Sequence, residues 1–124
     1  MNAIEQARQA YAPTQFSIRT NRSVEAQLFS QITARLRQAA TGQPTNFPAL
    51  VAAVHENRRM WAAMAADVAD GDNALPRPLR AQIFYLAEFT ETHSRRVLRH
   101  DADVSALIDI NTAVIRGLNS RGVA

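Results

Sequence analysis

The stretch NRRMWAAMAADVADGDNALPRPLRA, residues 57–81, decides how this chain folds. It starts in an alanine-rich, helix-favouring run that contains the single tryptophan, Trp61, and glycine interrupts this run at Gly71. Two prolines follow at Pro76 and Pro78. Because proline disfavours helical geometry in the residue before it, regular helix is expected to resume at Pro78. The stretch therefore predicts the end of one helix, a corner and the start of the next helix.

Helical periodicity extends to both sides of this corner. The helix before it is expected to begin near Pro48 and to end at Gly71, because its apolar residues fall close to one line at 100° per residue. These residues are Leu50, Val54, Trp61, Met64 and Val68. The helix after the corner is expected to run to about residue 99. Its apolar face consists of Leu79, Ile83, Leu86 and Val97.

The rest of the chain adds two long helices and an N-terminal segment. Residues 23–40 predict a helix whose stripe is Val24, Leu28, Ile32 and Leu36, widened by Phe29. A last helix, capped by Asp101 or Asp103, is expected to reach residue 118 and to bury Leu107, Ile110, Val114 and Leu118. A short helix over residues 2–12 and a connecting arm over 13–22 precede these elements.

The expected fold is all-α, an antiparallel bundle of four main helices with a short N-terminal helix and arm. We divide the single domain into the N-terminal segment 1–22, the bundle 23–118 and a flexible tail 119–124. The 124 residues are enough for one core but not for two. No leader resembles a signal peptide, and the longest apolar run, ALVAAV at 49–54, is too short to cross a membrane. We therefore expect a soluble, cytoplasmic protein.

The charge balance is less basic than the pI of about 10.5 suggests. All 14 basic residues are arginine and 11 residues are acidic, so the formal net charge is only +3. Without lysine or cysteine, almost nothing titrates between histidine and arginine, and this gap raises the pI. The composition alone is therefore weak support for binding to nucleic acid.

Polar residues interrupt the apolar stripes at Asn57, Thr90, His93 and Asn111. They could form a polar pocket, but we favour buried amides that bond across helices and fix their register. His93 and His100 lie about 10 Å apart along a helix, which is too far to share one ion. The absence of cysteine excludes disulfides and thiolate metal sites. No motif places a nucleophile beside a base. We expect no metal, no cofactor and no enzymatic activity.

Two features point to a partner-binding surface. Phe84 and Tyr85 lie off the main stripe of their helix, and together with Ala87 and Leu98 they suggest a groove for a partner helix. Phe16 and Ile18 of the N-terminal arm are predicted to belong to the same partner-binding surface, with the arm moving aside. Burial of this face by the arm is the alternative. Seven arginines also cluster in the two central helices: Arg58, Arg59, Arg77, Arg80, Arg95, Arg96 and Arg99. They form either a basic patch or ordinary solvated faces, since acidic residues are interspersed.

The order of these features resembles the FlaF family of flagellar biosynthesis regulators in alphaproteobacteria. The matching blocks are Tyr11, then VEAQLFSQITARL, NRRMW, NALPRPLRAQIFYL and LIDINTAVIRGL, in the right order and spacing. They cover the chain from about Tyr11 to Leu118. We regard the residues in these blocks as mainly structural: Asn57, Arg58, Trp61, Asp67, Asn73, Leu75, Pro76, Leu79, Arg80, Leu107, Asn111, Gly117 and Leu118.

The resemblance implies a cytoplasmic factor that binds flagellin, is needed for its synthesis and export, and acts opposite FlbT, which restrains translation of flagellin messenger RNA. A regulator that contacts RNA directly, or an adaptor whose main partner is FlbT, is the alternative. Within the fold we expect Trp61 to anchor the core, Asn57 to fix the register one turn before it, and residues 73–76 to form the corner. Arg58 and Arg80 are expected to pair with Asp67 or Asp109, or to face a partner.

Overall fold

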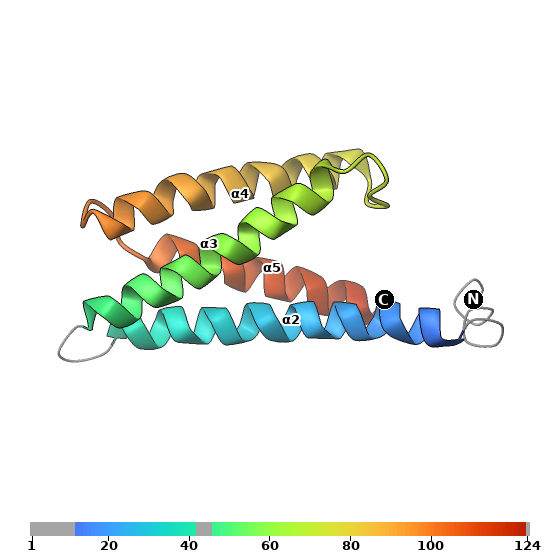
Figure 1. Ribbon diagram of the computed structural model, residues 1–124, viewed down its shortest axis with the longest axis horizontal. Helices are drawn as coiled ribbons and strands as arrows, with labels where there is room; N and C mark the ends of the chain where they lie inside the picture. Colours follow the sequence, from blue (N-terminus) through green and yellow to red (C-terminus); the bar gives the residue numbers. More distant parts are fainter. Residues whose placement is uncertain (1–11, 42–45, 124) are drawn as a thin grey trace.

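The computed structural model describes the backbone over residues 12–41 and 46–123, and the side chains over 27–41 and 46–117. Within these ranges it consists of four helices: α2 (Ala12–Thr41), α3 (Phe47–Ala69), α4 (Arg77–Leu98) and α5 (Ser105–Val123). Consecutive helices run in opposite directions (Figure 1). The all-α antiparallel bundle predicted from the sequence is confirmed.

Helix α3 is the central element of the arrangement. It crosses diagonally from the C-terminal end of α2 to the N-terminal end of α4, which lie on opposite sides of the molecule (Figure 1). Helix α5 returns beside α2 and touches α4 less than it touches α2. Because α3 packs on both α2 and α4, it joins the two sides of the bundle.

Side-chain caps explain where the helices begin and end. The side chain of Asn46 accepts a hydrogen bond from the backbone nitrogen of Ala49 at 3.1 Å, and Pro48 occupies the first turn of α3. At the predicted corner, Asn73 Nδ2 donates to the carbonyl oxygen of Asp67 at 3.1 Å. Asn73 Oδ1 accepts from the backbone nitrogen of Leu75 at 3.0 Å. The corner over residues 73–76 therefore forms as predicted.

Helix α5 begins at the second of the two aspartates expected to cap it. Asp103 Oδ1 accepts a hydrogen bond from the backbone nitrogen of Ser105 at 2.7 Å, and this bond lowers the pKa of Asp103 below its ordinary value of 3.8. Between α4 and α5 the chain reverses at His100, which has φ of 65°, in the left-handed region often used after a helix C-terminus.

Two boundaries differ from the sequence-based expectation. Residues 13–22, expected as an arm, belong to α2, because Pro13 falls in the first turn, where its missing N–H costs no hydrogen bond. Helix α5 continues to Val123, so the backbone is helical beyond the expected end at residue 118. The short helix expected over residues 2–12 lies outside the described residues except for Ala12.

The core consists of two clusters of buried side chains. The first cluster comprises Leu36, Ala53, Val54, Val97, Val104 and Leu107. The tryptophan cluster comprises Phe29, Ile32, Met60, Trp61 and Ala87. Phe29 presents its edge to Trp61, with ring centroids 5.7 Å apart and an interplanar angle of 87°. Trp61 is 1% exposed, which confirms it as a core anchor.

The stripe predicted for the second helix was partly wrong. Leu28 is 42% exposed, whereas Phe29 and Thr33 are buried. The predicted stripe steps by four residues each time and so drifts by 40° per step, whereas the buried face alternates steps of three and four. The side chains of Val24 and Leu118, also predicted to be buried, lie outside the described side chains.

Candidate partner-binding surface

A buried chain of hydrogen bonds joins α3 to α5 beneath the surface. Trp61 Nε1 donates to Asn111 Oδ1 at 2.9 Å, and Asn111 Nδ2 donates to Asn57 Oδ1 at 2.7 Å. Asn57 and Asn111 have no exposed surface. Because these bonds form only when the two helices are correctly aligned, they fix the register between α3 and α5, as predicted for Asn57.

Three further buried polar atoms lie near the α3–α4 contact without a hydrogen-bond partner. They are Asn57 Nδ2, Thr90 Oγ1 and Ser94 Oγ. Amides and hydroxyls alone are poor ligands for a transition metal. Among the described residues no group of three His, Cys, Asp or Glu side chains could hold an ion.

His93 joins two elements at the edge of the bundle and is not a core residue, contrary to the prediction. Its Nε2 donates to the carbonyl oxygen of Asp103 at 2.7 Å, and its ring stacks on Phe89 with centroids 5.5 Å apart. His100 stacks instead on Phe47, at the start of α3. The two histidines therefore hold the connection between α4 and α5 in place, His93 from α4 and His100 through its contact with the start of α3.

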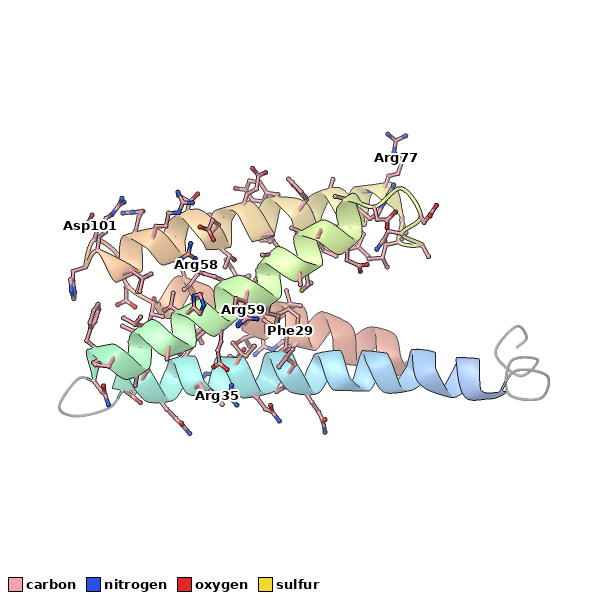
Figure 2. The ribbon with its side chains drawn as sticks, in the orientation of Figure 1. Phe29, Arg35, Arg58, Arg59, Arg77 and Asp101 are labelled. Carbon is pink, nitrogen blue, oxygen red and sulfur yellow. The ribbon has the colours of Figure 1, made fainter. Side chains whose placement is uncertain are left out.

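An ion pair fastens the outer side of the α3–α4 contact. Arg58 Nε and Nη2 donate to the two carboxylate oxygens of Glu91 at 3.0 and 2.6 Å, and Arg95 Nε donates to Glu91 Oε2 at 2.9 Å. The hydrogen bonds from Arg58 hold the pKa of Glu91 below its ordinary value of 4.5. The same bond to Glu91 raises the pKa of Arg58. Figure 2 shows Arg58 between α3 and α4.

Neither motif arginine pairs with Asp67 or Asp109, whereas the alternative that Arg80 faces a partner stays a prediction. Arg58 binds Glu91 and not Asp67, because nine residues along α3 place Asp67 on the opposite side of the helix from Arg58. Arg80 Nη1 donates to the backbone carbonyl oxygen of Asp70 at 3.3 Å, so it closes the end of α3 and pairs with neither Asp67 nor Asp109.

An open depression of about 390 Å³ lies where the end of α3 meets the start of α4. Phe84 and Tyr85 are 41% and 65% exposed and lie side by side in its lining. The lining residues are Val68, Ala69, Arg77, Arg80, Ala81, Phe84, Tyr85 and Glu88. The depression therefore combines exposed aromatic side chains with charged side chains of both signs.

Other residues predicted for this surface lie elsewhere. Ala87 is buried in the tryptophan cluster, and Leu98 packs against the first cluster, about 21 Å along α4 from Phe84. The side chains of Phe16 and Ile18 lie outside the described side chains, so their role stays a prediction. Phe89, which the sequence did not single out, is also exposed, although it does not line the depression.

The remaining motif residues divide between core and surface. Leu107 is fully buried, whereas Leu75 and Leu79 are half-buried near the corner. Gly117 is exposed, and a Cβ built there would meet nothing within 4 Å, so no close approach requires glycine at this position.

Three of the seven arginines in the predicted basic patch are paired with carboxylates. Arg58 and Arg95 share Glu91, and Arg99 Nε lies 3.5 Å from Asp101 Oδ2. Arg35, on α2, pairs with Glu56 of α3 at 2.7 Å. Paired guanidinium groups are less available to phosphates, so these three arginines of the patch are less suited to bind nucleic acid. In the described residues Arg59, Arg77, Arg80 and Arg96 have no carboxylate partner.

None of the helices in the described ranges combines the length and apolarity needed to cross a membrane. The family model described as "Flagellar protein FlaF" matches residues 7–118. Neither the curated proteins nor the solved structures contain a match.

Proposed function

The chain belongs to the FlaF family of flagellar proteins and takes part in flagellar biogenesis, and we propose that it binds flagellin in the cytoplasm as a chaperone-like factor that promotes flagellin synthesis and secretion. The family is not one of enzymes. The observation that carries the proposal is the exposure of Phe84 and Tyr85 in a depression between α3 and α4.

The depression suits a client with amphipathic helices. A helix that packs only in its final assembly exposes an apolar stripe beforehand, and such a stripe binds readily in an apolar groove between two helices. Phe84, Tyr85 and Val68 supply the apolar contacts.

The second candidate function is direct binding of flagellin messenger RNA. The third is that the protein is an adaptor whose main partner is FlbT. An RNA interface needs unpaired cations beside stacking aromatics. In the described residues Arg58, Arg95 and Arg99 are paired with carboxylates, which removes part of the basic patch. Arg77 and Arg80 are not paired and lie beside Phe84 and Tyr85, so co-purification has to separate RNA from a protein client. An adaptor for FlbT would use the same kind of apolar surface as a flagellin chaperone, so the two differ only in the protein bound.

Co-purification of the full chain from its native cytoplasm tests these candidates. We expect flagellin to accompany the protein both with and without nuclease treatment. Recovery of FlbT without flagellin would show that FlbT, and not flagellin, is the bound protein. Loss of the bound material on nuclease treatment, or its loss over a modest rise in salt, would instead indicate RNA, because phosphate contacts weaken steeply with salt.

A charge at the centre of the depression tests the surface. Phe84→Glu should abolish flagellin binding, because it places a carboxylate among the apolar contacts, while circular dichroism stays helical. Thr92→Glu is the matched control, since Thr92 is exposed on the same helix but does not line the depression. If Phe84→Glu binds flagellin as well as Thr92→Glu does, the binding surface lies elsewhere.

A further inference from the structure

The two ends of the depression carry opposite charges. Arg77 and Arg80 line the end at the start of α4, and Glu88 lines the other end. Eight residues separate Arg80 from Glu88, about 12 Å along the helix, and Phe84 lies halfway between them. Along α4 the surface therefore presents a cation, an aromatic ring and an anion, one turn apart.

The cationic end has unused hydrogen-bond donors. Arg80 Nε is buried and has no partner, although Nη1 of the same guanidinium reaches the carbonyl oxygen of Asp70. In the described part of the chain no carboxylate pairs with Arg77, and Figure 2 shows its side chain extending from the start of α4 into solvent. A buried donor without a partner is unfavourable until an acceptor reaches it.

Glu88, at the anionic end of the depression, also lacks an ion-pair partner in the described residues, unlike the nearby Glu91. Glu91, one turn beyond Glu88, is already held by Arg58 and Arg95. No arginine is paired with Glu88 in the described ranges, although it is exposed at the rim of the depression. The two ends are thus complementary to a carboxylate and a cation supplied by a bound partner.

We propose that the depression binds an amphipathic helix whose contacting face carries a carboxylate at the Arg77–Arg80 end, a large apolar residue against Phe84 and a cation at Glu88. The carboxylate accepts hydrogen bonds from the guanidinium of Arg80 and from Arg77. The opposite charges set the direction of the bound helix, since reversing it would place like charges together. This inference rests on the proposed function only in taking the client to be helical.

Labelled peptides and the full chain test the charge pattern. The probe is an alanine-rich helix of about 20 residues with Glu, Leu and Lys spaced one turn apart, and fluorescence anisotropy measures its binding. Replacing the peptide Glu by Gln should weaken binding roughly tenfold or more, because a charge-assisted bond is lost. Arg80→Gln should weaken binding of the Glu peptide and leave the Gln peptide unchanged, as a double-mutant cycle requires.

Arg77→Gln repeats the measurement at an exposed position, in case Arg80→Gln disturbs the end of α3. Arg59→Gln, at an exposed residue of α3 outside the depression, is the matched control and should bind all peptides equally. Equal binding of the Glu and Gln peptides to the parent chain would overturn the inference. Flagellin could still bind in a Phe84-dependent way, and then the proposed function would stand without it.

The peptide measurement also separates a failure of the proposed function from a failure of this inference. If the peptides show the predicted charge dependence but flagellin does not co-purify, the groove is correctly assigned and the client is another helical protein. The other occupant to be tested is a second copy of this chain. Its α4 carries a cation, an aromatic ring and an anion in order, at Arg80, Phe84 and Glu88, so two antiparallel copies of α4 would be complementary. Sedimentation that shows a dimer dissociated by Glu88→Gln would assign the groove to self-association and overturn the proposal.

Discussion

Trp61 is the single residue in the described ranges that belongs both to the apolar core and to the buried hydrogen bonds between α3 and α5. Its ring packs against Phe29, and its indole nitrogen donates to Asn111, which in turn donates to Asn57. A buried indole needs a hydrogen-bond partner for its N–H group, and the amide of Asn111 supplies it while also reaching α3 a second time. One side chain thus supports both the packing and the alignment of α3 and α5.

Replacement of this residue should be costly. We expect Trp61→Ala to lower the free energy of unfolding by about 3–5 kcal/mol, because the cavity left behind is only partly filled. Urea denaturation followed by circular dichroism measures the loss. Trp61→Phe, which keeps an aromatic ring but removes the N–H donor, should lose less. A variant Trp61→Ala that unfolds like the parent would contradict the assignment of Trp61 to the core.

Asn111 tests the register chain separately from packing volume. Asn111→Leu leaves Trp61 Nε1 and Asn57 Oδ1 buried without partners, so we expect a loss of about 2 kcal/mol and poorer dispersion of NMR signals. In the Trp61→Phe background the same change should cost less, because the donor is already absent. A raised melting temperature for Asn111→Leu would show that the buried bonds are not needed.

Among the helices, the ion pair between Arg58 and Glu91 links the side chains of α3 and α4 near the surface. Only partly shielded from solvent, it contributes no more than about 1 kcal/mol. Arg95 adds a second donor from the next turn of α4. The pair therefore contributes more to the alignment of α3 with α4 than to the stability of the fold.

The pH dependence of stability should reveal this pair. Because its pKa is lowered in the folded state, Glu91 contributes stability that is fully present above its ordinary pKa of 4.5 and is lost as the pH falls through the lowered value. Glu91→Gln should therefore be less stable than the parent near neutral pH and match it in acid. Urea denaturation at several pH values measures the difference, with Glu88→Gln as the control. A pH-independent difference would contradict the assigned role.

The whole molecule behaves as one cooperative unit in our interpretation. The first cluster and the tryptophan cluster both draw side chains from α2, α3 and α4, so neither can open without displacing helices that the other needs. Helix α5 contributes Leu107 to the first cluster and Asn111 to the bonds with Trp61. We therefore expect a single unfolding transition.

Leu107→Ala measures this coupling. It should cost about 2–5 kcal/mol, because Leu107 has no exposed surface and its removal leaves a cavity in the first cluster. Trp61 fluorescence, which reports on the other cluster, should shift to the same denaturation midpoint as circular dichroism. Leu28→Ala, at an exposed position, is the control with the same chemical change. Separate midpoints for the two probes would show that the clusters unfold independently.

The sequence by itself determined the features that depend on neighbours along the chain. The corner at residues 73–76, the extent of α3 and α4, and the burial of Trp61, Asn57 and Asn111 all follow from proline geometry and a 3.6-residue period. Each of these signals lies within a few turns of one helix. The assignment to a flagellar family also came from blocks of this local kind.

Only the tertiary structure decided which residues meet across helices. The sequence could not show that Arg58 would pair with Glu91 of α4, or that Leu98 would pack in the core while Phe84 stayed exposed. Phe84 and Leu98 occupy similar positions around α4, but Leu98 packs against the first cluster, which includes Val104 and Leu107, whereas Phe84 lies in the depression where α3 ends. A periodic pattern states which side of a helix is apolar, whereas the crossing angle of its neighbour decides how much of that side is covered.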